Sequence, residues 1–102
     1  MNAHAEYNAL LDYCRKHGIT VRLVGENELH DYAAMNEMAA KRIGFPCKKN
    51  EILLDKNPDM VRRVRNLRHE LVERNLMKEG KTYWEAHVIS LRREKQHCKR
   101  LR

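Results

Sequence analysis

Apolar and polar residues follow one another along this chain with two different periods, and glycines and prolines separate the segments. Residues 5–17 carry apolar side chains at helical spacing and stop before a glycine, which predicts a first helix. Residues 19–24 alternate apolar and polar side chains between two glycines, a period typical of a strand with one buried face. Residues 50–55 predict a second short strand by the same criterion.

Between these two strands, a broad apolar stripe extends from Asn27, which can cap a helix, to Gly44, which can end one. We expect a second helix over this whole segment, and its alanines permit close packing. The stripe consists of Leu29, Tyr32, Ala33, Met35, Ala39 and Ala40.

The third predicted helix, residues 58–79, has the clearest boundaries. Asn57 can cap its start, Pro58 suits the first helical position, and Gly80 follows its end. An apolar stripe at helical spacing faces the expected core and consists of Met60, Val64, Leu67 and Leu71.

A fourth helix is predicted to begin at Thr82 and Glu85, which form a capping box that satisfies two backbone amides. The link of Gly80 and Lys81 is so short that this helix must fold back beside the third one. We expect Trp84, in its first turn, to pack in the core.

Together these elements predict a small single α+β domain over residues 1–96, with four helices and a short two-stranded sheet. The length of 102 residues and the hydrophobic fraction of 42% suffice for one modest core. Residues 97–102 are basic and have no apolar period, so we expect a frayed tail there.

The third helix contains the sequence HELVE, from His69 to Glu73. A helix turns by about 100° per residue, so these two side chains lie on the same face, one turn apart. In metalloprotease helices with the motif HExxH, the two outer positions bind zinc and the glutamate after the first histidine is the general base. His87, in the second turn of the next helix, can come near the Glu73 end. The candidate metal ligands are therefore His69, Glu73 and His87, with Glu70 as the candidate base.

Zinc accepts two imidazoles and one carboxylate as ligands and keeps a fourth position for water. With Glu70 taking a proton from that water, this set predicts metal-assisted hydrolysis of an amide bond. The same ligands suit iron(II) or manganese, although a chain this helical is an unusual host for iron oxygenases. The simpler alternative is that the glutamates are solvated helix charges and that His69 and His87 are ordinary half-buried histidines.

Three segments carry a resemblance to a known family: AAMNEMAAKRIGFP, NEILLD and RNLRHELVERNLM, all within residues 33–86. This half of the chain resembles the compact zincin-type metallopeptidase domains of the ImmA/IrrE kind. The resemblance implies a helix, a short edge strand and then the HExxH helix. It also implies cleavage of a DNA-binding repressor, in a setting of mobile elements or stress regulation.

Carried over by position, this resemblance makes His69 the first zinc ligand and Glu70 the general base. Glu73 occupies the second ligand position, where the family has histidine, and His87 lies where a downstream third ligand can be. The departure at Glu73 leaves three alternatives: a changed metal preference, an inactive relative, or a likeness of fold alone.

The formal net charge is +7, so the surface should attract polyanions such as nucleic acid. The alternative function is therefore a non-enzymatic module that binds a partner protein or nucleic acid on a degenerate zincin-like fold. No zinc-finger spacing or aromatic RNA-binding motif is present, which excludes the common sequence-reading modules. The candidate phosphate-binding residues are Arg92, Arg93, Lys95, Lys99, Arg100 and Arg102.

Cysteine spacing and hydropathy bear on the cellular compartment. Cys14, Cys47 and Cys98 are far apart and form no CxxC pair, which favours reduced thiols. Residues 1–18 lack the unbroken apolar stretch of a signal peptide, and no run approaches the roughly 20 apolar residues that span a bilayer. We therefore expect a cytoplasmic protein without membrane contact, and the sequence leaves its oligomeric state open.

Overall fold

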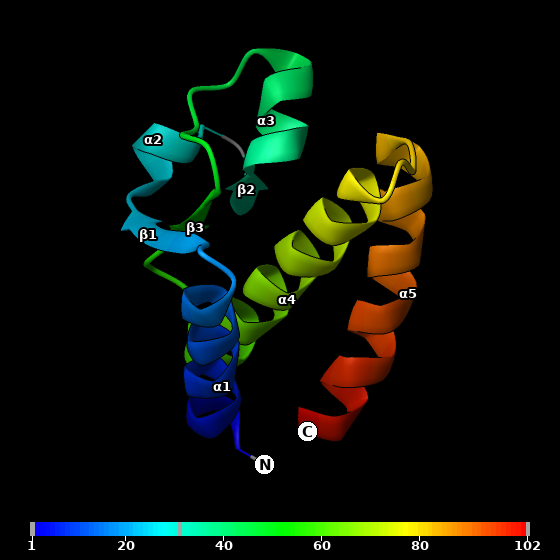
Figure 1. Ribbon diagram of the computed structural model, residues 1–102. Helices are drawn as coiled ribbons and strands as arrows, with labels where there is room; N and C mark the ends of the chain where they lie inside the picture. The colour runs from blue at the N-terminus through cyan, green and yellow to red at the C-terminus, as the bar shows by residue number, and fades with distance from the viewer. Residues whose placement is uncertain (1, 31, 102) are drawn as a thin grey trace.

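The computed structural model describes residues 2–30 and 32–101, apart from the side chains of residue 26 and residues 96–101. This part of the chain forms five helices and three strands, and the predicted α+β class is confirmed. The elements are α1 (Ala3–Lys16), β1 (Thr20–Val24), α2 (Glu26–Leu29), β2 (Ala34–Asn36), α3 (Glu37–Ile43), β3 (Glu51–Asp55), α4 (Met60–Lys78) and α5 (Tyr83–Leu101) (Figure 1).

The strands form one mixed sheet in the order β1-β3-β2. The central strand β3 pairs in parallel with β1, through Thr20 opposite Glu51, and antiparallel with β2, through Asn36 opposite Ile52. β3 is buried along almost its whole length, as expected of a strand covered on both faces.

Helices cover both faces of the sheet. Successive residues of β3 point to opposite faces, so each face contributes to its own apolar cluster. Ile52 and Leu54 pack with residues of α1 and α4 in one apolar cluster. Leu53 points the other way and packs with residues of α2, β2 and α3 in a second cluster. The predicted core face of α4 is confirmed, since Val64 and Leu67 are fully buried in the first cluster.

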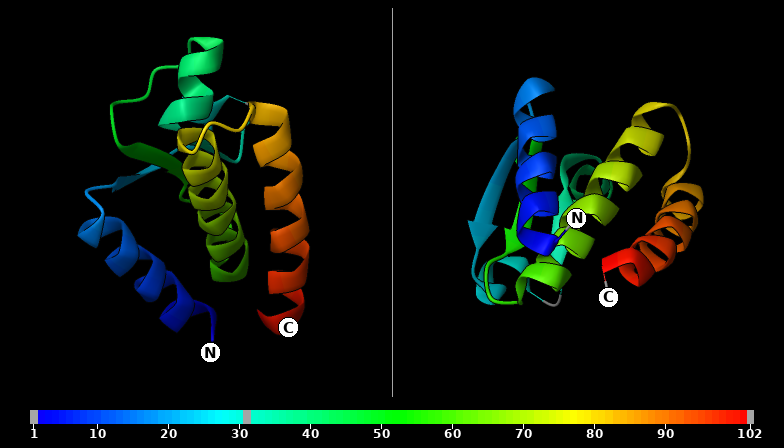
Figure 2. Two further views of the ribbon diagram at one scale, coloured as in Figure 1. Left: turned by 45° about the vertical axis from the view of Figure 1, so that its right-hand side comes forward. Right: turned by 90° about the horizontal axis from the view of Figure 1, so that it is seen from below.

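α4 and α5 form a helical hairpin, with α4 between the sheet and α5 (Figures 1 and 2). Gly80 follows α4 with a positive φ of 105°, and the backbone amides of Gly80 and Lys81 donate to the last turn of α4. The predicted capping box of α5 is confirmed, because Thr82 and Glu85 each bond the other's backbone amide. None of the described helices is both long enough and apolar enough to cross a membrane.

The predicted helix from Asn27 to Gly44 is wrong, and with it the count of four helices and two strands. α2 ends after Leu29, because His30 takes a φ of 58°, which a right-handed helix does not accommodate. The chain then forms strand β2, and Asn36 caps a separate helix α3 through a hydrogen bond from the backbone amide of Ala39 to its side-chain oxygen, 3.0 Å long.

The start of α4 also differs from the prediction. Asp59, not Asn57, is the N-cap, and its carboxylate accepts a hydrogen bond from the backbone amide of Arg62. Asn57 instead donates its backbone amide to the carboxylate of Asp55, the last residue of β3. A capping carboxylate also interacts favourably with the positive end of the helix dipole, which favours the later start.

The expected basic tail at residues 97–102 falls on the last turns of α5 and beyond. The side chains of residues 96–101, and residue 102 altogether, lie outside the described residues. Fraying of this tail therefore stays a prediction.

Trp84 does not pack in the core as predicted: it is 64% exposed, at the start of α5. Replacing it should therefore change stability little, whereas replacing the fully buried Leu67 leaves a cavity. In urea unfolding we expect Trp84→Ala to cost less than about 1 kcal/mol and Leu67→Ala about 2–5 kcal/mol. Equal costs would contradict the exposed position of Trp84.

Candidate metal centre

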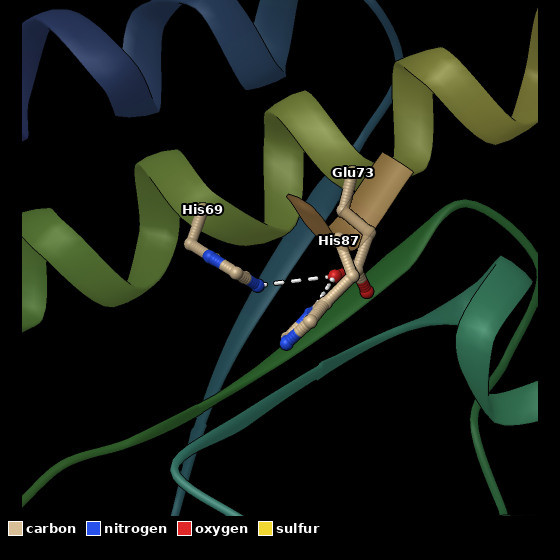
Figure 3. Close-up of side chains that lie close together, drawn as sticks. All are labelled: His69, Glu73 and His87. Carbon is tan, nitrogen blue, oxygen red and sulfur yellow. Dashed lines mark hydrogen bonds and ion pairs between the residues drawn. The ribbon is translucent and has the colours of Figure 1, made fainter. Parts of the chain in front are cut away.

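Two of the candidate ligands, His69 and His87, converge on one oxygen atom of the third, Glu73. Glu73 Oε2 lies 3.0 Å from His69 Nε2 and 2.9 Å from His87 Nδ1 (Figure 3). His69 and Glu73 are neighbours because they lie one turn apart on α4. His87 reaches them because the short link after Gly80 folds α5 back along α4.

Glu73 is a buried carboxylate, only 2% exposed, and both of its oxygens accept hydrogen bonds. Oε2 accepts from the two imidazoles, and Oε1 accepts a hydrogen bond of 3.2 Å from the side-chain amide of Asn36. Burial alone raises the pKa of Glu73, but the bonds from His69 and His87 outweigh it and bring the pKa below its ordinary value. The group is therefore an anion held inside the protein.

His69 is held through both ring nitrogens. Nε2 faces Glu73, and Nδ1 lies 2.9 Å from Glu94 Oε2 on α5. Arg65 in turn lies 3.3 Å from the other oxygen of Glu94. Burial lowers the pKa of His69, but the hydrogen bonds to Glu73 and Glu94 outweigh it and raise the pKa to about 10. The ring is thus oriented with Nε2 directed at the cluster.

Glu70 lies beside the cluster and is 7% exposed. Its Oε1 accepts a hydrogen bond of 3.1 Å from the side-chain amide of Asn36, and its Oε2 lies 3.9 Å from His69 Nε2. Burial, and next the charge of Glu73, raise the pKa of Glu70 to about 7. The carboxyl group therefore exchanges protons near neutral pH in the metal-free protein.

The donor atoms form a group that could hold a metal ion. An ion about 2.0–2.2 Å from each of three atoms requires them to lie about 3–4 Å apart. The donor atoms of His69, Glu73 and His87 lie within 4.8 Å of one another, so an ion would have to draw them closer together to bind all three. Two imidazoles and one carboxylate are also the set found at catalytic zinc sites. In the structure, ring N–H groups interact with the carboxylate, so metal binding would displace protons.

The cluster opens into a cavity of about 440 Å³, whose walls come from β2, α3, α4 and α5. His69, Glu70, Glu73 and His87 all line it. A cavity of this size, mostly apolar with a few convergent polar groups, is typical of a ligand site.

Sequence reasoning missed two residues of this centre, Asn36 and Glu94. Asn36 falls inside the helix predicted from Asn27 to Gly44, where the pattern gives its side-chain amide no hydrogen-bond partner. Glu94 could have been found, because it follows His87 by seven residues and so lies on the same face of α5 two turns later.

The predicted phosphate-binding residues whose side chains the structure describes do not join the centre. Arg92, Arg93 and Lys95 are exposed on α5 and do not line the cavity. The side chains of Lys99, Arg100 and Arg102 lie outside the described residues.

No protein family, no curated protein and no solved structure matches this chain. The resemblance to ImmA/IrrE-type zincin domains therefore stays a prediction from the motif and its setting.

In metal-free protein, we expect the free energy of unfolding to fall as pH rises from about 5 to 10. The pKa of Glu70 is raised from 4.5 to about 7, so the cost of its buried charge develops over that interval. The pKa of His69 is raised from 6.5 to about 10. Its charge therefore stabilises the fold fully below pH 6.5, and this stabilisation is lost as the pH rises to about 10. Urea unfolding at each pH, with chelator present, measures this.

Glu70→Gln provides the control, because it should remove the decline between pH 5 and 7 and keep the decline above it. Wild-type stability that increases between pH 6 and 9 would contradict both assignments.

Proposed function

We propose that this protein is a metal-dependent hydrolase of peptide bonds that binds zinc, or another divalent cation, through His69, Glu73 and His87. The observation that carries the proposal is that His69 Nε2 and His87 Nδ1 converge on Glu73 Oε2, at the wall of a cavity that Glu70 also lines. Charged side chains at the surface are hydrated by water, so they need neither burial nor hydrogen bonds to one another.

The surroundings of the ligands support the proposal independently. Metal-binding histidines almost always donate their other ring nitrogen to a carboxylate or carbonyl, and the second ring nitrogen of His69 meets Glu94. Ligating carboxylates are themselves hydrogen-bonded, and Asn36 donates to Glu73. Both contacts orient the donor atoms before an ion arrives.

Glu70 is suited to act as general base and then as general acid. When bound, a divalent cation lowers the pKa of a water ligand and polarises a carbonyl group. Asn36 holds one oxygen of Glu70, while the other lies 3.9 Å from the donor nitrogen of His69. Glu70 can therefore take a proton from a water molecule while the water oxygen attacks the carbon of a peptide carbonyl. It can then deliver that proton to the nitrogen of the departing amine.

The substrate and the cell compartment belong to the proposal as well. A protein or peptide substrate follows from the peptidase chemistry, and the resemblance to ImmA/IrrE-type domains implies a DNA-binding repressor. The wide spacing of the three cysteines favours a reducing compartment, which is the basis for proposing a cytoplasmic location.

Metal binding is tested with protein purified without a metal-affinity tag. Elemental analysis should find about one zinc per chain, and His69→Ala or His87→Ala should weaken zinc affinity more than about 100-fold, because each removes a ligand. His17→Ala is the matched control, since His17 is exposed, bonds to Tyr13 of α1 and is not among the residues that line the cavity. Unchanged affinity in both ligand variants would exclude this metal centre.

Catalysis is tested with Glu70→Gln and an unstructured protein substrate. The variant should keep its zinc, because Glu70 is not a ligand, and should lose about 10²- to 10⁴-fold in the rate of peptide hydrolysis. Wild-type protein that holds zinc but cleaves nothing would favour the alternative of a binding module. In that case, association with DNA that falls steeply as salt rises would identify nucleic acid as the partner.

A further inference from the structure

Arg42, in the last turn of α3, is an exposed cation at the wall of the cavity. Among the residues that the structure describes, no carboxylate lies within ion-pair distance of it. Arg65, Arg68 and Arg74, by contrast, each pair with a glutamate. The guanidinium of Arg42 is therefore available to an anion from outside the protein.

Two aromatic rings support this guanidinium. Its Cζ lies 4.7 Å from the ring centroid of Tyr83 and 5.7 Å from that of Trp84. A guanidinium stacked on a ring keeps its N–H edge free for two parallel hydrogen bonds to a carboxylate. Tyr83 in turn stacks on His87, with centroids 5.3 Å apart and planes inclined by 18°. Arg42 is thus connected to a candidate metal ligand through one ring.

Four exposed apolar side chains also line the cavity. Tyr32, Ile43, Trp84 and Leu91 line it, and each keeps more than a third of its surface accessible. Exposed apolar side chains gathered at one opening are typical of a binding site. Arg42 is also the one lysine or arginine among the lining residues of the described chain.

We propose that this opening binds a carboxylate group of a peptide, with Arg42 as its receptor and Trp84 in contact with a neighbouring apolar side chain. The identity of the ligand as a peptide rests on the proposed function. An acidic side chain and a C-terminal carboxylate present the same chemistry, so either can supply the group.

The charges of the cavity favour a single carboxylate over nucleic acid. Binding of single-stranded nucleic acid requires a positive groove that follows several phosphates. Here Arg42 is the one lysine or arginine among the described lining residues, so the cavity offers no groove of that kind.

The test uses the fluorescence of Trp84, the chain's one tryptophan, as the signal for binding. The probes are Ac-Leu-Ala-Asp-Ala-Leu-amide, its counterpart with asparagine, and Ac-Leu-Ala-Leu with a free or an amidated C-terminus. We expect at least one carboxylate peptide to bind about 10- to 100-fold more tightly than its neutral counterpart. The two pairs distinguish a side-chain from a terminal carboxylate.

Variants assign the preference to one residue. Arg42→Ala should abolish it, and Arg42→Lys should keep part of it, since the charge remains without the planar fork. Arg62→Ala is the matched control, because Arg62 is exposed and lies outside the cavity lining. Equal binding of charged and neutral peptides, a preference that survives Arg42→Ala, or tighter binding of an oligothymidylate would each overturn the proposal.

The measurement is made on zinc-loaded and on chelated protein, with zinc content determined on the same samples. Arg42 is not a metal ligand, so the preference should persist in chelated protein. A preference seen only with zinc would assign the carboxylate to the metal and overturn the proposal for Arg42. A chain that binds no zinc but keeps the preference would refute the metal centre alone.

Discussion

The buried charge of Glu73 is the constraint on which the arrangement of α4, α5 and β2 depends. A carboxylate taken out of water costs several kcal/mol unless hydrogen bonds and opposite charges replace its hydration. Here the replacement comes from three elements: His69 on α4, His87 on α5 and Asn36 at the end of β2. Each element must therefore sit where its polar group reaches the same carboxylate.

Asn36 connects this constraint to the sheet. Its backbone pairs with Ile52 of the central strand, its side-chain oxygen caps α3, and its side-chain amide donates to Glu70 and Glu73. One residue thus ends β2, begins α3 and orients two carboxylates of α4. Its capping role is local, but its pairing with Ile52 and its bonds to Glu70 and Glu73 involve groups far apart in the sequence, which leave no local signal.

This explains how much the sequence could predict. Periodicity within α4, and the short link to α5, sufficed to bring His69, Glu73 and His87 together, since all these relations are local. The division of the segment from Asn27 to Gly44 depends on pairing with β3 and on contacts to α4, which override its apolar helical stripe. Trp84 was misjudged because a helical pattern cannot tell which face meets a neighbour and which borders a cavity.

The polar cluster also determines how α5 is held. α4 directs its apolar side chains, such as Val64 and Leu67, at the sheet, and turns Glu73 and His69 toward α5. The contacts of α5 with α4 therefore include ionisable groups. Protons and metal ions compete with each other for these groups. An ion held by residues of both helices would bind more tightly when α5 is packed on α4 than when the two helices are apart. Docking of α5 and occupancy of the centre would then be linked by mass action, and the same residues would serve stability and chemistry.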